Sequence, residues 1–117
     1  MLVVYDSMTG NVERFVKKLG VKNVKIHKEL IVNEPFILIT YTTGFGQLPQ
    51  STTNFLSKNN RYIIAVASSG NRNWGKNYGF AAELISKQYD VPIILKFELS
   101  GTEDDIKIFT QEMQKFV

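Results

Sequence analysis

Ser7, Thr9 and Gly10 lie in a short polar stretch near the N-terminus, and residues of these types bind anions. They follow residues 2–5, an apolar and aromatic run that predicts a buried strand. They precede residues 11–19, where apolar side chains recur at the spacing of an amphipathic helix. At such a junction the free N–H groups of the first helical turn and the helix dipole favour a negative charge. The stretch therefore predicts an anion site, and the alternative is an ordinary turn that caps the helix.

The first loop, residues 6–10, differs from two common phosphate-binding motifs. No Gly-Lys-Ser or Gly-Lys-Thr follows it, as a P-loop requires, and it lacks the Gly-x-Gly-x-x-Gly spacing of a dinucleotide site. The loop contains no Lys or Arg. We therefore expect that backbone N–H groups and neutral side chains hold a phosphate there.

Two further polar loops follow predicted strands. Residues 36–41 are apolar on both faces, as central parallel strands are, and they lead into the second loop, residues 42–49. Residues 62–67 predict another buried strand, which is followed by the third loop, residues 68–75. Both loops are rich in glycine and in hydroxyl or amide side chains, and a predicted helix follows each of them.

Strands and helices alternate along the whole chain. Further strands are predicted at residues 24–27 and 93–99, and Thr102 with Asp105 predicts a capping box at the start of the last helix. This alternation predicts an α/β three-layer sandwich with a flavodoxin-like, five-stranded parallel sheet in the order 2-1-3-4-5. The connection between His27 and Pro35 has no helical pattern, so we expect it to cross the first strand in extended form.

This strand order would place the three loops side by side at the carboxyl edge of the sheet. Ligands of open α/β sheets bind at that edge, where the strand order reverses. The aromatic residues Tyr41, Phe45 and Trp74 occur near the polar residues. The combination suits a flat aromatic ligand that carries a phosphate, which in outline is FMN. The first loop would bind the phosphate, and the other two loops would flank the ring.

The composition is typical of one globular domain, which we expect to span residues 1–117. The chain contains no Cys and only one His, His27, which excludes thiolate chemistry and a multi-histidine metal site. The formal net charge of +3 is too small and too dispersed to predict nucleic-acid binding. No apolar run could span a bilayer, and the sequence begins directly in a strand. We therefore expect a cytoplasmic protein that binds neither nucleic acid nor membrane.

Four segments of the chain carry a resemblance to a known family. Residues 6–12, Asp-Ser-Met-Thr-Gly-Asn-Val, resemble the phosphate loop of flavodoxins. Residues 40–46, 67–75 and 96–102 resemble the corresponding segments of the NrdI family, and the order and spacing of the segments agree over nearly the whole chain. NrdI proteins are small flavodoxin-like proteins associated with class Ib ribonucleotide reductase.

The resemblance implies an FMN protein that serves the metal-containing small subunit of this reductase. After reduction by an electron donor, FMN would react with O₂ to give superoxide or a related oxidant. The oxidant would help to form the dimanganese–tyrosyl radical cofactor, which is an activating role rather than that of a stand-alone enzyme. The alternatives are an ordinary one-electron-transfer flavodoxin and an interaction module without a cofactor. A serine hydrolase is disfavoured because His27, the one possible base, lies too early in the chain.

The loops and the resemblance together assign the expected cofactor contacts. The phosphate contacts are Ser7, Met8, Thr9, Gly10, Asn11 and Val12. The ring contacts are Thr42, Thr43, Gly44, Phe45, Gly46, Ser69, Gly70, Asn71, Trp74 and Gly75. For Trp74 the alternative is a side chain that fills the core. We hypothesise that Gly44 has a redox role, because a glycine peptide can turn to offer flavin N5 either its N–H or its C=O.

Overall fold

The computed structural model describes residues 1–44 and 46–116, without the side chains of Trp74 and Lys76. The predicted contacts of Phe45 and of the Trp74 side chain therefore lie outside the described residues. In chain order the elements are β1 (Leu2–Tyr5), α1 (Asn11–Leu19), β2 (Asn23–Lys25), β3 (Phe36–Tyr41), α2 (Gln50–Lys58), β4 (Ile63–Gly70), a 3₁₀ helix η1 (Arg72–Asn77), α3 (Phe80–Tyr89), β5 (Ile93–Glu98) and α4 (Glu103–Gln114).

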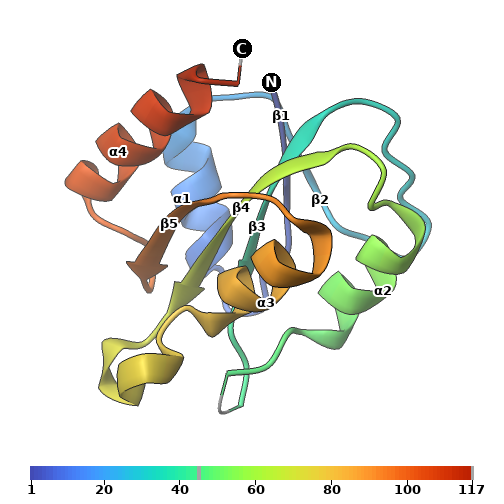
Figure 1. Cartoon of the computed structure of the whole chain (residues 1–117). Coiled ribbons are helices and arrows are strands. Elements are labelled where there is room, and N and C mark those ends of the chain that lie inside the picture. Colours follow the sequence, from blue (N-terminus) through green and yellow to red (C-terminus); the bar gives the residue numbers. More distant parts are fainter. Residues whose placement is uncertain (45, 117) are drawn as a thin grey trace.

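The five strands form one parallel sheet in the order β2-β1-β3-β4-β5, which confirms the predicted topology. The side chains of β1 are all buried, and those of β3 are buried except at the last residue. These strands are apolar on both faces because helices cover both faces of the sheet. All five carboxyl ends point to the same edge, the lower one in Figure 1.

Helices α1 and α4 cover one face of the sheet, and α2 and α3 cover the other (Figure 1). On the first face the ring of Phe15 stacks on Phe97 with centroids 4.0 Å apart and meets the edge of Phe109 at 5.6 Å. The turn before α4 passes very close to this cluster. A Cβ at Gly101 would lie 2.6 Å from a ring carbon of Phe15, so only glycine fits there.

Three strands differ in length from the expectation, and the smallest difference is that β5 ends at Glu98 instead of residue 99. β2 ends at Lys25, so His27 follows the strand instead of ending it. β4 continues to Gly70, so Ser68 and Ser69 belong to the strand and not to the third loop. Ser68 can be buried because its hydroxyl donates to the carbonyl of Gly79 and accepts from an N–H of α3. A buried hydroxyl with both partners carries little penalty.

The connection between β2 and β3 contains no helix, as expected, and Asn59 at the end of α2 fixes it. The Asn59 Nδ2 atom donates to the carbonyls of Leu30 and Phe55, each at 3.0 Å. Its Oδ1 atom accepts from the N–H of Val32 at 2.8 Å. One buried amide at the end of α2 therefore joins the helix to the connection through two hydrogen bonds, and the third fixes the amide to α2 itself.

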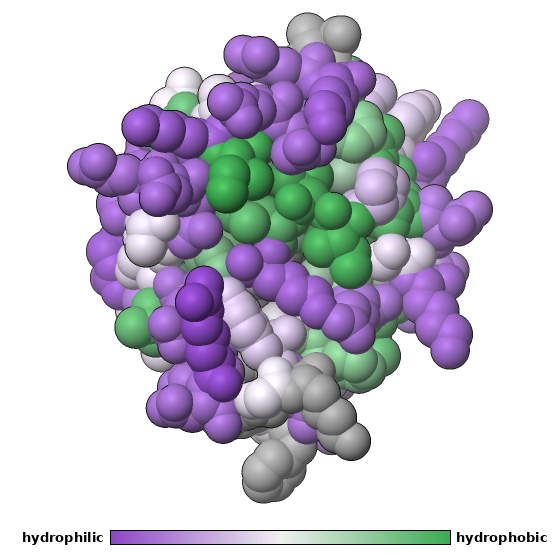
Figure 2. Space-filling view, turned by 60° about the vertical axis from the view of Figure 1, so that its left-hand side comes forward, coloured by the Kyte–Doolittle hydropathy of each residue, from purple (hydrophilic) through white to green (hydrophobic). Residues whose placement is uncertain are grey.

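Strand β5 forms one edge of the sheet. Figure 2 turns the side with α4 and β5 forward and shows an apolar area surrounded by hydrophilic residues. Exposed large hydrophobic residues of these two elements include Ile93 and Ile108. Among the described residues, no helix combines the length and the apolar character needed to cross a membrane.

Replacing Asn59 should destabilise the fold more than replacing its neighbour Asn60. We expect Asn59→Ala to lower the free energy of unfolding by about 2–4 kcal/mol, because it leaves buried backbone groups without partners. Asn60→Ala is the matched control, since Asn60 is exposed and makes one side-chain hydrogen bond, to Leu56. Asn60→Ala should lower the free energy of unfolding by about 1 kcal/mol or less. Urea unfolding followed by circular dichroism measures both, and equal losses would contradict the bridging role of Asn59.

Candidate functional site

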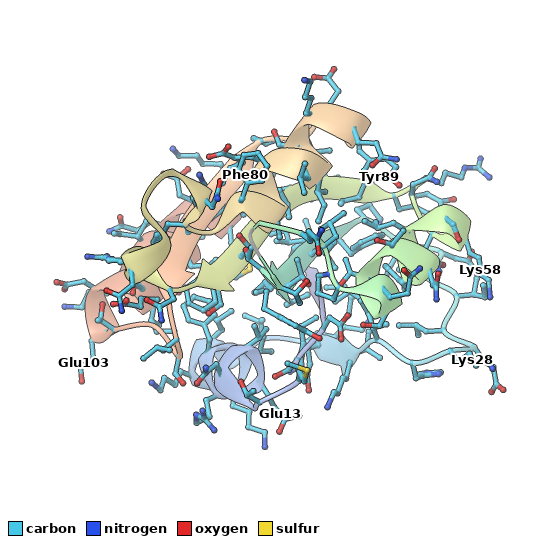
Figure 3. The ribbon with its side chains drawn as sticks, turned by 90° about the horizontal axis from the view of Figure 1, so that it is seen from below. Glu13, Lys28, Lys58, Phe80, Tyr89 and Glu103 are labelled. Atoms are coloured by element: carbon cyan, nitrogen blue, oxygen red, sulfur yellow. The ribbon has the colours of Figure 1, made fainter. Side chains whose placement is uncertain are left out.

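A cleft of about 180 Å³ opens at the carboxyl edge of the sheet. Figure 3 views the molecule from this end, with Glu13 of α1 and Phe80 of α3 labelled on opposite sides. The cleft is lined by residues of all three predicted loops and of the turn after β5: Ser7, Met8, Thr9, Asn11, Val12, Tyr41, Thr42, Ser69, Gly70, Asn71, Asn77 and Leu99. None of these lining residues is acidic or basic.

The first loop contributes five of its six expected contact residues to the lining. The sixth, Gly10, is the N-cap of α1 and has a left-handed backbone with φ 90°. The N–H of Glu13 in the first turn donates to the Ser7 hydroxyl at 3.4 Å. The N–H groups of Asn11 and Val12 have no hydrogen-bond partner among the described residues, so they remain available to a ligand. The start of α1 therefore has the donors that an anion requires.

Arg14 brings a positive charge to the first loop, which had been expected to contain only neutral donors. Its Nη2 atom donates to Asn11 Oδ1 at 2.6 Å, and its Nε atom donates to Ser100 at 3.0 Å. The guanidinium also lies against Gly10, where a Cβ would be 2.8 Å from Nη1. The sequence reasoning missed Arg14 because it lies inside the helix, outside the polar stretch.

The second loop lies mostly beside the cleft. Thr42 lines it, and its hydroxyl accepts from the N–H of Ala81 at 3.2 Å. Thr43, Gly44 and Gly46 instead form a tight turn closed by backbone hydrogen bonds between Thr43 and Gln47, each 2.8 Å long. Gly44 is exposed and has φ 52°. The structure does not bring these three residues into the lining, and their ring contacts remain predictions.

The third loop divides in a similar way. Ser69 and Gly70 at the end of β4, and Asn71 after it, line the cleft, whereas Gly75 lies outside the lining, at a non-helical kink within η1. Residue 70 must be glycine, because a Cβ there would lie 2.7 Å from the backbone nitrogen of Gly79. The Ser69 hydroxyl donates to the carbonyl of Leu99 at 2.7 Å, which joins this loop to the turn after β5.

Leu99 and Asn77 are lining residues that the sequence reasoning missed. Leu99 has a left-handed φ of 54°, which is unusual for leucine, and the residue is 55% exposed at the cleft. Its N–H donates to the carbonyl of Gly70 at 3.3 Å. The available signal was its position as the last residue of the predicted fifth strand, at the same edge as the three loops.

Asp6 is a buried carboxylate beside the cleft, and the start of α2 satisfies it. Asp6 accepts hydrogen bonds from the hydroxyls of Ser51 at 2.5 Å and Thr52 at 2.7 Å. The Thr52 oxygen lies 2.8 Å from the Thr40 hydroxyl, which must be the donor because Thr52 gives its own proton to Asp6. The first loop and the helix that follows the second loop are thus joined through one charge.

Burial raises the pKa of Tyr41 above its ordinary value, and the negative charge of Asp6 raises it further. Hydrogen bonding by Ser51 has the opposite, smaller effect on that pKa. Both larger effects disfavour the phenolate. Tyr41 therefore lines the cleft as a neutral hydrogen-bonding phenol at physiological pH.

Removing the charge of Asp6 should lower the pKa of Tyr41. In Asp6→Asn the repulsion of the phenolate disappears, while burial of the ring continues to raise the pKa. The phenolate absorbance, titrated against pH, measures this shift. The absorbance titration is repeated for wild type and for Asp6→Asn with Tyr41 replaced by Phe. Subtracting each of these curves from that of its parent protein leaves the contribution of Tyr41 alone. An unchanged Tyr41 pKa in Asp6→Asn would show that the two groups do not interact.

Comparisons with known proteins give one consistent family. Residues 3–111 match the family described as NrdI Flavodoxin like. Protein NrdI of Bacillus licheniformis is 55% identical, over 98% of this chain and 88% of that protein. The SPbeta prophage-derived protein NrdI of Bacillus subtilis is 47% identical, over 96% of this chain and 90% of that protein.

Solved structures agree with the topology. Oxidised Flavodoxin 1 from Bacillus cereus has a TM-score of 0.75 and 21% identity, over 99% of this chain and 97% of that one. A short-chain flavodoxin associated with a bacterial microcompartment has a TM-score of 0.76 and 19% identity, over 97% of this chain and 93% of that one. These likenesses confirm the flavodoxin-like fold. Since the family match and the NrdI relatives extend over nearly the whole sequence, this chain belongs to the NrdI flavodoxin-like family.

Proposed function

We propose that this chain binds FMN and supplies an oxidant made from O₂ to the small subunit of class Ib ribonucleotide reductase, for assembly of its dimanganese–tyrosyl radical cofactor. The observation that carries the proposal is the convergence of three polar loops on one cleft between β1, β3 and β4. That cleft adjoins the switch point of the sheet, where such folds bind ligands. Membership of the NrdI flavodoxin-like family supports the flavin and the reductase as partner.

The cleft residues fit FMN. The N–H groups of Asn11 and Val12, together with the hydroxyls of Ser7 and Thr9, would hold the phosphate. The charge of Arg14 lies nearby. We expect the cleft of about 180 Å³ to hold the phosphate and the adjoining chain of the ligand. The ring would extend toward the second and third loops. We assign the domain, residues 1–117, to this one function in the cytoplasm.

Bound FMN supplies transfer of one or two electrons and, when reduced, electron transfer to O₂. The chain's own residues set the electrostatic conditions for this chemistry. The cleft lining carries no charge, and Asp6 is the one buried carboxylate among the described residues. The net charge of the chain is +3. Little negative charge near the ring therefore opposes the uptake of electrons from a donor.

The second candidate function is one-electron transfer as in an ordinary flavodoxin. The likeness of the fold to oxidised Flavodoxin 1 from Bacillus cereus favours this candidate. The two functions differ in what the reduced protein does in air. An electron-transfer flavodoxin keeps its electrons for a protein acceptor, whereas an oxidant supplier passes them to O₂.

Stepwise anaerobic reduction followed by exposure to air separates these functions. We expect the purified protein, loaded with FMN, to lose its flavin absorbance on reduction and to recover it rapidly in air. Superoxide should be released, measured as cytochrome c reduction that superoxide dismutase suppresses. A one-electron-reduced form that persists in air with little superoxide would favour the second candidate. A protein that takes up no FMN would contradict both.

The redox hypothesis for Gly44 predicts that Gly44→Val shifts the redox titration of the bound flavin. Gly44 has φ 52°, which β-branched residues adopt poorly, and a Cβ there would lie 3.0 Å from Gln47 Oε1. We expect a shift equivalent to about 1–2 kcal/mol, the penalty of a left-handed residue with a side chain. Gly20→Val is the matched control, since Gly20 has φ 66° at the end of α1. Identical redox titrations of the bound flavin in wild type and in Gly44→Val would contradict the hypothesis.

A further inference from the structure

A second hollow, here called the α2 groove, lies between α2 and residues 26–30 and has a volume of about 340 Å³. Figure 3 labels Lys28 and Lys58 at the same side of the molecule, away from Glu13 and Phe80. The groove shares no lining residue with the cleft described above. It is lined by Ile26, His27, Lys28, Leu30, Ser51, Asn54, Phe55, Ser57, Lys58 and Asn59.

The two walls of the groove are held at a fixed separation. Asn59 donates to Leu30 in one wall and to Phe55 in the other, and it also accepts from the N–H of Val32. Asn59 is 3% exposed, and its hydrogen bonds to Val32 and Phe55 are buried. A groove fixed in this way loses little conformational entropy when an occupant binds.

The charge of the groove is positive. Its lining contains two cationic side chains, Lys28 and Lys58, and neither Asp nor Glu. In the part of the chain that the structure describes, neither of these lysines forms an ion pair, whereas Lys22 and Lys25 on the neighbouring surface are paired with Glu34 and Glu13. The charge at the groove is therefore left for an anionic partner to neutralise.

The floor of the groove is apolar. Phe55 belongs to the core on this face of the sheet, and Ile26 and Leu30 pack against the same core while remaining partly exposed. Lysines beside an apolar floor suit a segment in which acidic residues flank an apolar side chain. The carboxylates would meet the lysines, and the apolar side chain would cover the floor.

We infer that the α2 groove docks an acidic segment of the partner protein, which under the proposed function is the reductase small subunit. This inference rests on the proposed function for the identity of the partner and on the charges and floor of the groove for the segment. The lining of the groove includes Ser51, whose hydroxyl donates to Asp6, the first residue of the first loop. A partner seated there would lie next to the edge at which the cleft opens.

Charge reversal at the groove tests the inference. The FMN-loaded full chain is immobilised, and biolayer interferometry measures its Kd for purified class Ib small subunit. The double variant Lys28→Glu/Lys58→Glu should bind about tenfold or more weakly, because repulsion replaces attraction at two contacts. The control Lys18→Glu/Lys107→Glu makes the same change in net charge at two exposed positions outside the groove. Its Kd should stay within about twofold of wild type.

The possible results separate the inference from the proposed function. Selective weakening of the groove variant, with unchanged circular dichroism and FMN affinity, supports the docking site. Equal Kd values for the groove variant and the control overturn the inference and leave the proposed function standing. If wild type does not bind the small subunit, the partner in the proposed function is wrong, and the occupant inferred for the groove is overturned with it.

Discussion

The parallel direction of all five strands is the constraint on which the site depends. It places the ends of β1, β3, β4 and β5 at one edge, although their residues are far apart in the chain. The hydrogen bond of 2.9 Å between Ser100 and Asn11, 89 residues apart, joins the turn after β5 to the start of α1. A mixed sheet would divide these segments between two edges, and no single cleft could contain them.

The parallel arrangement also brings polar groups together at this edge, and α2 stabilises one of them, Asp6, by hydrogen bonds. Asp6 follows the buried residues of β1 directly and is itself buried. Helix α2 has no acidic residue in its first turn and no side-chain cap of its own. Asp6 takes that place from another part of the chain, since its charge lies at the positive end of the helix and two hydroxyls of that turn bond to it. One carboxylate thus stabilises a helix and positions the first loop.

The topology and the first loop could be predicted because each depends on local pattern. Apolar runs marked β1, β3 and β4, and the polar residues that follow them marked the loops. Residues that depend on distant partners could not be predicted. Ser68 looks like a loop residue until its partner Gly79 is known. Leu99 lines the cleft only because a leucine adopts a left-handed turn held by the Gly70 carbonyl. The NrdI resemblance was confirmed by the comparisons.

The contact between Gly70 and Gly79 has a consequence for how this sequence can diverge. A Cβ at Gly70 would meet the backbone of Gly79 at 2.7 Å, and a Cβ at Gly79 would meet Lys96 at 3.0 Å. Backbone cannot turn aside as a flexible side chain can, so no substitution elsewhere on the surface relieves the first contact. A single substitution of Gly70 is therefore not tolerated without a movement of the backbone. A side chain could enter at Gly70 only if the junction between η1 and α3 moved as one piece, which would displace Asn77 at the same time.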